Sequence, residues 1–137
     1  MTDTVQKVAY YKTTVSNRPG AGARVLGALR AAGVNLLAFH AFPAGKRAQL
    51  DFVPKDAGAF TRAARKAGIK LGPKKTAFLV TGRDRRGAVA QLLGKLGESG
   101  ISVTALTGVH AGGGRFGAIF WVDPKDVKKT AKTLGAR

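Results

Sequence analysis

The chain has 137 residues, of which 45% are hydrophobic, so it is long enough for one compact domain or for two very small units that share a core. It contains no cysteine, which excludes disulfide scaffolds, thiol nucleophiles and cysteine metal sites. Its 24 Lys and Arg residues against 7 Asp and Glu give a formal net charge of +17. Such a surface attracts polyanions irrespective of their sequence, but it does not identify a site.

The positive charges are scattered along the chain. The densest groups lie at residues 73–75, 83–86 and 125–129, and none is a tail of five or six like charges. We therefore expect solvated helix faces rather than a dedicated polyanion groove. Residues 1–17 mix polar and apolar side chains, which predicts neither a signal peptide nor a membrane span and favours a cytoplasmic location with no membrane partner.

An internal repeat organises the sequence. Gly20 and Gly87 lie 67 positions apart, and the same shift superimposes Leu29 on Leu96 and the segment "GVN" at Gly33 on "GIS" at Gly100. The chain is therefore predicted to contain two copies of one unit, residues 1–72 and residues 73–137.

The first copy begins with residues 8–15, "VAYYKTTV", which predict a strand because aromatic and β-branched residues dominate them. "NRPG" then predicts a turn, residues 21–32 a helix, and Gly33 the end of that helix. Residues 34–42 and 48–53 predict two strands joined by "PAGK". Asp56 can cap a second helix, and "IKL" at residues 69–71 predicts a short fourth strand.

The second copy repeats this order. Residues 76–81 predict a strand, Val89, Leu92 and Leu96 recur with helical spacing, two strands flank "HAGGG", and residues 127–134 predict the last helix. The chain then stops, so the second copy lacks its final strand and leaves a sheet edge that something should cover. Two βαββαβ units with helices on one face of antiparallel sheets predict an α+β, ferredoxin-like fold.

The glycine-rich turn before the first helix suggests a dinucleotide fingerprint, because the amides at a helix start bind pyrophosphate. "GAGARV" places Val25 where the third glycine of G-x-G-x-x-G belongs, and the next acidic residue is Asp51, too late to bind a ribose. The turn therefore does not favour a nucleotide cofactor, and we expect no cofactor.

The strand, turn, helix and following strand resemble the ACT domain, a small-molecule-sensing module of amino-acid-metabolic enzymes. The resemblance rests on Asn17, Arg18, Pro19 and Gly20, on the helix positions Val25, Leu26 and Leu29, and on Gly33, Val34 and Asn35. It covers nearly the whole chain as a tandem pair. It implies an amino-acid ligand held against the loop between first strand and first helix, often at an interface between two units.

By this resemblance the ligand-binding residues are Asn17, Arg18, Pro19, Gly20, Ala21, Gly22 and Asn35. The two asparagines would bind the carboxylate and amine of the ligand, while backbone amides around Gly20 and Gly22 approach it closely. The alternative is structural: Asn17 shapes a turn, Pro19 starts a helix and Asn35 satisfies a strand end.

The second copy departs from this pattern, since Asp84, Arg86 and Ser102 replace Asn17, Pro19 and Asn35. An aspartate at this turn would repel a carboxylate. Arg83, Arg85 and Arg86 could offset that repulsion or capture a different anion. We expect the second site to be altered or lost.

Residues 114–121, "GRFGAIFW", partly match an RNA-recognition signature. Strand alternation puts Phe116, Ala118 and Phe120 on one face, with Ile119 and Trp121 on the other. In an RNA-binding protein the outer rings would stack on bases, whereas in a tandem sensor they pack against a sheet or a second chain. We favour packing, because Gln49 and Asp51 occupy the matching positions of the first copy.

Catalysis has little support. His40 and His110 are the only histidines, they are not spaced like a metal pair, and no constellation of Ser, Asp or Glu recurs near them. We expect no catalytic residue, no metal and no enzyme activity.

The sequence thus predicts a non-catalytic regulatory protein that binds an amino acid, forms a homodimer and passes its signal to a separate protein partner. The alternative is a basic nucleic-acid-binding module of the same fold, with Arg83, Arg85, Arg86 and Arg115 as phosphate contacts. A purely structural dimerisation module is the third reading.

Overall fold

A computed structural model describes residues 3–137. The described chain is an α+β protein with six β-strands and four α-helices. Its first strands and helices are β1 (Thr4–Ser16), α1 (Ala21–Ala31), β2 (Leu36–Ala44), β3 (Arg47–Pro54) and α2 (Ala57–Lys66). They are followed by β4 (Lys75–Arg83), α3 (Ala88–Glu98), β5 (Val103–Gly112), β6 (Arg115–Val122), a 3-10 turn at Pro124–Asp126 and α4 (Val127–Leu134).

The chain divides into two compact units. The first unit is Ala9–Lys75, and the second is Thr76–Arg137 together with the N-terminal residues up to Val8. The predicted boundary had placed those N-terminal residues in the first repeat. The strand order is β2-β3-β1-β4-β6-β5, with β1 beginning in the second unit and ending in the first.

In the first unit, β1 pairs antiparallel with β3 from Tyr11 to Ser16, and β3 pairs antiparallel with β2. Helices α1 and α2 pack onto this ladder through a core of Tyr11, Leu29, Leu50, Phe52 and Phe60. The Phe60 ring lies 5.3 Å from the rings of both Tyr11 and Phe52, so an aromatic cluster joins α2 to the sheet.

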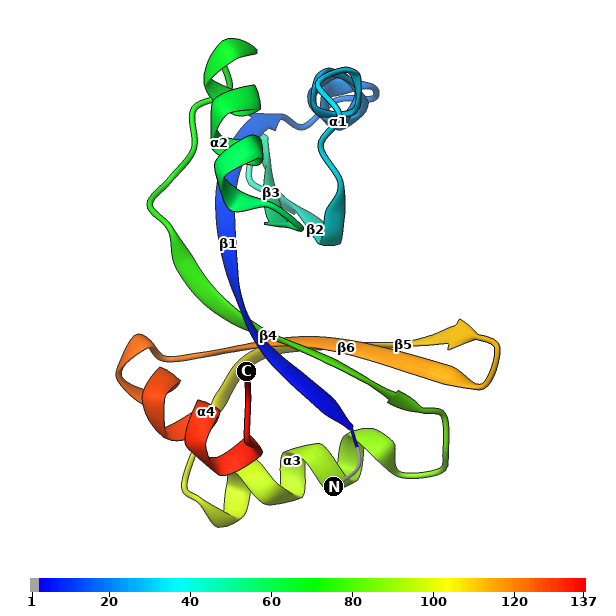
Figure 1. Cartoon of the computed structure of the whole chain (residues 1–137). Helices are drawn as coiled ribbons and strands as arrows, with labels where there is room; N and C mark the ends of the chain where they lie inside the picture. The colour runs from blue at the N-terminus through cyan, green and yellow to red at the C-terminus, as the bar shows by residue number, and fades with distance from the viewer. Residues whose placement is uncertain (1–2) are drawn as a thin grey trace. The chain divides into compact units, whose positions relative to one another are not determined.

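In the second unit, β6 pairs antiparallel with β4 and β5, and α3 and α4 lie on the same side of these strands (Figure 1). Val5, Phe78, Leu92 and Phe120 are among the buried core residues. Val5 therefore belongs to the core of the second unit although it lies at the start of the chain.

The missing last strand of the second unit is replaced by the start of β1. Residues 4–8 of β1 lie beside β4, and the Lys7 N–H donates to the Arg137 carbonyl (3.0 Å) while the Arg137 N–H donates to the Val5 carbonyl (3.1 Å). The open edge expected from the sequence is thus covered by the N-terminus of the same chain, and its backbone groups are paired.

The ends of the elements follow local signals. Asp56 caps α2, as predicted, because its carboxylate accepts a hydrogen bond from the Ala59 N–H (3.0 Å). Gly33 adopts φ +78° after α1 and Gly100 adopts φ +70° after α3, the left-handed conformation that terminates helices.

The predicted fourth strand at residues 69–71 is not formed. Thr13 Oγ1 donates to the Lys70 carbonyl (2.7 Å) and the Gly72 N–H donates to the Lys12 carbonyl (2.8 Å), so the segment follows β1 through isolated hydrogen bonds. Pro73 comes next and has no N–H to extend the pairing.

We expect Val5→Ala to lower the free energy of unfolding by about 1–3 kcal/mol, because it removes two methyl groups from a side chain that is only 2% exposed in the core of the second unit. Urea denaturation followed by circular dichroism measures the change. Lys7→Ala, at an exposed position of the same segment, is the control and should change stability by less than about 0.5 kcal/mol. Equal effects of the two variants would contradict this role of Val5.

Candidate functional site

The predicted ligand loop of the first unit is an exposed turn at the end of β1. The Asn17 N–H donates to the Lys46 carbonyl (3.1 Å), and the Arg18 N–H donates to the Ser16 carbonyl (2.9 Å). Gly20 adopts φ +86° and precedes α1 without a side-chain cap, so the first N–H groups of the helix are not covered by a side chain. Residues 17–20 are all exposed, and Ala21 and Gly22 are half-buried at the start of the helix.

Asn35 lies at the other end of the same unit. Its carbonyl accepts from the Lys55 N–H (3.0 Å) beside the end of β3, whereas Asn17 pairs with Lys46 just before the beginning of β3. The eight residues of β3 span about 26 Å between these two points. The two asparagines therefore do not meet within one unit, because α1 carries the chain back along the sheet before β2 begins.

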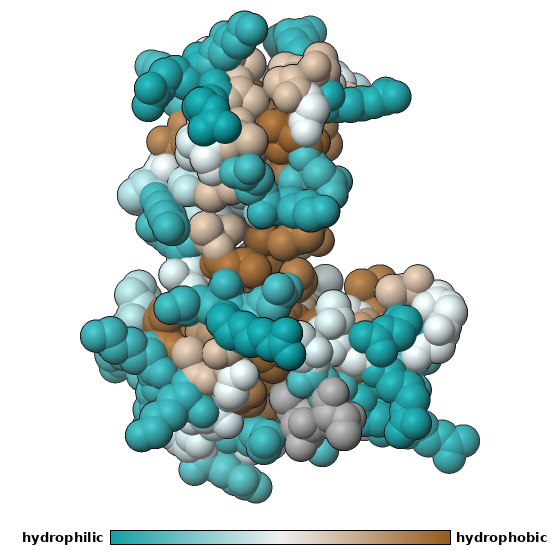
Figure 2. All heavy atoms as spheres, viewed as in Figure 1, coloured by the Kyte–Doolittle hydropathy of each residue, from teal (hydrophilic) through white to brown (hydrophobic). Residues whose placement is uncertain are grey.

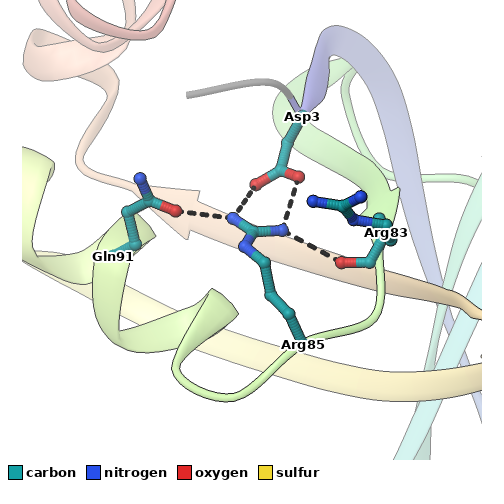
Figure 3. Close-up of polar contacts among 4 residues, drawn as sticks. All are labelled: Asp3, Arg83, Arg85 and Gln91. Carbon is teal, nitrogen blue, oxygen red and sulfur yellow. Dashed lines mark hydrogen bonds and ion pairs between the residues drawn. The ribbon is translucent and has the colours of Figure 1, made fainter.

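The corresponding turn of the second unit is built around Arg85. Its guanidinium donates to both carboxylate oxygens of Asp3 (3.0 Å each), to the Gln91 side-chain oxygen (2.6 Å) and to the Arg83 carbonyl (3.0 Å), as Figure 3 shows. The Asp3 side chain is 1% exposed, and the Arg85 guanidinium carbon lies 5.8 Å from the centre of the Phe116 ring. The hydrogen bond to Asp3 also raises the pKa of Arg85, so the guanidinium stays charged.

The hydrogen bonds of Arg85 therefore link the turn at residues 83–86 to Asp3, just before β1. Gly82 makes the close approach possible, because a Cβ at this position would overlap the Asp3 carboxylate and the Phe116 ring. Arg83 and Arg86 are exposed on either side of this cluster, and Arg83 pairs across the ladder with Arg115. Of the three arginines expected to contact an anion, Arg83 and Arg86 are the accessible ones.

A hollow of about 300 Å³ lies beside this turn, between the start of α3 and β5. Its polar wall contains Asp84 and His110, whose carboxylate oxygen and Nε2 are 3.5 Å apart. Its apolar wall contains Val89, Val109 and Phe116. The helix begins at Gly87, which has φ +75° and no side chain to cap the N–H groups of the first turn.

These groups offer two kinds of polar contact within one small hollow. Uncapped N–H groups at a helix start attract carboxylates, and an aspartate attracts an ammonium group. The sequence predicts that this second turn has altered or lost its site, and the sequence pattern does not reveal the approach of β5, which brings His110 to Asp84. Gly108 permits that approach, since a Cβ there would lie 3.2 Å from the Val89 side chain.

The sheet face of the first unit away from its helices holds a buried carboxylate. Asp51 is 6% exposed, accepts a hydrogen bond from the Gln49 side chain (2.9 Å), and pairs across the ladders with Lys12 and His40. Burial raises the pKa of Tyr10, and the charge of Asp51 raises it further. Asp51 is thus buried beside polar neighbours on this face of the sheet.

The aromatic strand of the second unit is not a base-stacking surface. Phe116 and Phe120 are 5% and 0% exposed within the core, Phe78 on the neighbouring strand is fully buried, and Trp121 on the opposite face is 8% exposed. Bases stack on accessible rings, so the RNA-recognition reading of this strand is not supported and the packing interpretation holds.

Across residues 3–137, no group of three or more His, Asp or Glu side chains is arranged to hold a metal ion. The helices in this part of the chain are also too short or too polar to cross a membrane.

Arg85→Gln should lower the urea midpoint of unfolding, because it leaves the Asp3 carboxylate buried without its cation. Arg86→Gln, at the exposed neighbouring position, is the matched control and should leave the midpoint unchanged. A similar midpoint for both variants would show that the contact between Arg85 and Asp3 does not stabilise the fold.

The raised pKa of Tyr10 predicts a loss of stability in alkali. The native state resists losing the phenolic proton, whereas an unfolded tyrosine loses it near pH 10, so the stability that Tyr10 contributes is fully present below about pH 10 and is lost as the pH rises through the folded pKa. Urea unfolding at pH 9 and pH 11 should show a smaller alkaline loss for Tyr10→Phe than for the unmodified chain. An alkaline loss in Tyr10→Phe as large as that of the unmodified chain would exclude Tyr10 as the cause.

No protein-family model and no curated protein matches the chain. Solved structures do match it. A protein of Bacteroides thetaiotaomicron aligns over 96% of this chain and 88% of its own length, with a TM-score of 0.81 and 16% identity. The ligand-free regulatory subunit of aspartate kinase from Thermus thermophilus aligns over 97% and 94%, with a TM-score of 0.64 and 16% identity. That from Thermus flavus aligns over 97% and 94%, with a TM-score of 0.56 and 15% identity. The chain therefore has the ACT-type fold of these regulatory subunits, as its sequence resemblance predicted.

Proposed function

We propose that the chain is a non-catalytic regulatory protein that binds a small, amino-acid-like ligand. The observation that carries this proposal is the hollow beside Asp84 and His110, where a carboxylate, an imidazole and uncapped helix amides surround about 300 Å³. Ligand pockets commonly measure about 300–1,000 Å³, so this one suits a small molecule. The likeness to regulatory subunits of aspartate kinase supports a regulatory role.

The arrangement suits a zwitterion. The ligand carboxylate would accept hydrogen bonds from N–H groups in the first turn of α3, and its ammonium group would bind Asp84. A small apolar side chain would then contact Val89 and Val109. Val109 is 60% exposed, so contact with a ligand would also cover an apolar surface that now faces water.

The turn at residues 17–22 is a second proposed position. Because Asn17 and Asn35 lie at opposite ends of the first unit, one ligand could contact both only if a second copy of the chain supplied one of them. The edge strand β2 exposes Leu37, Phe39 and Phe42, an apolar surface that suits such a homodimer.

Regulation requires that the ligand bind one arrangement of the protein more tightly than another. Since we assign no catalytic group to the chain, the change would be passed to a separate protein partner. We place this protein in the cytoplasm, where free amino acids are available as signals.

Thermal-shift screening of the twenty amino acids tests the function. An amino acid present at 100 times its dissociation constant should raise the free energy of unfolding by about 2.7 kcal/mol. Asp84→Asn should abolish the shift, whereas Glu98→Gln, at the exposed end of α3, should retain it.

Asn17→Ala separates the two positions in the same screen. If it alone abolishes the shift, the ligand binds the turn of the first unit instead of the hollow. If no amino acid produces a shift in the unmodified chain, the proposed ligand class is wrong.

A further inference from the structure

The charge of the protein is concentrated on the first unit. Ala9–Lys75 contains 13 Lys and Arg residues and only two acidic residues, Asp51 and Asp56. Asp51 is buried and accepts a hydrogen bond from Gln49, while Asp56 accepts one from the Ala59 N–H at the start of α2. Neither carboxylate forms an ion pair with a cation of the helices in the described chain.

Five of these cations are exposed on the two helices that cover the sheet of the first unit, and we call them together the basic helical face: Arg24, Arg30, Arg62, Arg65 and Lys66. They are exposed on α1 and α2, whose buried side chains Leu29 and Phe60 enter the same core. Among residues 3–137, no ion pair includes any of the five. Figure 2 shows hydrophilic side chains spread over α2.

The cations are separated mostly by small residues. On α1, the exposed positions between and beside Arg24 and Arg30 are alanine or glycine, so nothing bulky stands between the guanidinium groups and an approaching surface. One guanidinium group can donate two parallel hydrogen bonds to two oxygens of the same phosphate, a geometry that lysine does not offer. Four of the five cations are arginines.

The composition of this face discriminates between polyanionic partners. Helices that bind a membrane surface insert large apolar side chains, and protein interfaces depend on apolar or aromatic anchors. The large exposed hydrophobic residues of the described chain are Leu37, Phe39, Phe42, Leu93 and Val109, none of which lies on α1 or α2. The phosphate backbone of a nucleic-acid duplex is a partner that charge alone can hold, so it suits a face that has cations and no apolar anchors.

We propose that the basic helical face binds the phosphate backbone of double-stranded nucleic acid without reading its sequence. This function is additional to ligand binding in the second unit and does not depend on it. It also lies elsewhere than the alternative suggested by the sequence, since Arg85 is held by Asp3 and Gln91 in the second unit.

Fluorescence anisotropy with two unrelated 20-base-pair DNA duplexes tests the proposal. Four or five phosphate contacts should weaken binding by about 150- to 500-fold between 50 mM and 200 mM KCl, with a slope of about −0.9 per contact. Both duplexes should bind equally well. An RNA duplex of the same length shows whether the deoxyribose backbone is required; equal binding supports recognition of the phosphates.

The triple variant Arg62→Gln/Arg65→Gln/Lys66→Gln should reduce the magnitude of the salt slope by about 2.7, since each removed contact contributes about 0.9. The matched control is Lys128→Gln/Lys129→Gln/Lys132→Gln, which removes the same charge from exposed positions of α4. It should change the slope by less than one. Circular dichroism spectra and melting temperatures of both variants verify that they fold.

Three outcomes would overturn the proposal. Equal slopes for the two triple variants would mean that only net charge matters, and an unchanged slope in the α2 variant would remove α2 from the contact. Tight binding to vesicles of phosphatidylcholine and phosphatidylserine at 7:3, without binding to any duplex, would identify a membrane surface as the partner.

Discussion

The structure depends on the division of one strand between two cores. β1 is 13 residues long, its Val5 is buried in the core of the second unit, and its Tyr11 is buried in the core of the first. Because side chains alternate along a strand, a shift of register by one residue would turn both residues out of their cores at once. The same segment brings Asp3 to Arg85, and that pair holds the turn beside which the candidate ligand hollow lies. The pairing of the sheet, the packing of both cores and the shape of the hollow therefore all depend on the register of β1.

The sequence predicted the elements well because the local signals were strong. Aromatic and β-branched residues marked β1, Asp56 marked the start of α2, and the prediction for residues 127–134 agrees with α4. The errors arose where the outcome depends on distant residues. Residues 69–72 follow β1 through isolated hydrogen bonds only, and Pro73 has no N–H with which to extend them. The position of residues 3–8 depends on contacts with β4 and Arg137, which no local pattern reveals.

The candidate site was less predictable than the fold. Asn17 and Asn35 were expected to bind one ligand because both belong to the pattern that resembles the ACT domain. In the structure, α1 runs back along the sheet between β1 and β2, so the two asparagines lie at opposite ends of it. Arg85 looked like an anion-binding residue because two arginines flank it within four positions. Its actual partner, Asp3, is 82 residues away, and nothing in the sequence separates it from the other two arginines. Conversely, the contact between Asp84 and His110 depends on the register of β5 and β6, which composition does not determine.

The place of residues 3–8 has a consequence for how the protein folds. This segment precedes its neighbours on β4 by some seventy residues, and its hydrogen-bond partner Arg137 lies farther along the chain still. During synthesis the first unit can assemble around Tyr11 before β4 exists, and until then Val5 is exposed to water and its backbone groups are unpaired. Contacts between residues so distant in the chain slow folding, because loop closure must precede them. Completion of the second unit is thus the late step, and a chaperone that bound residues 3–8 until β4 had formed would protect an unpaired strand from incorrect pairing.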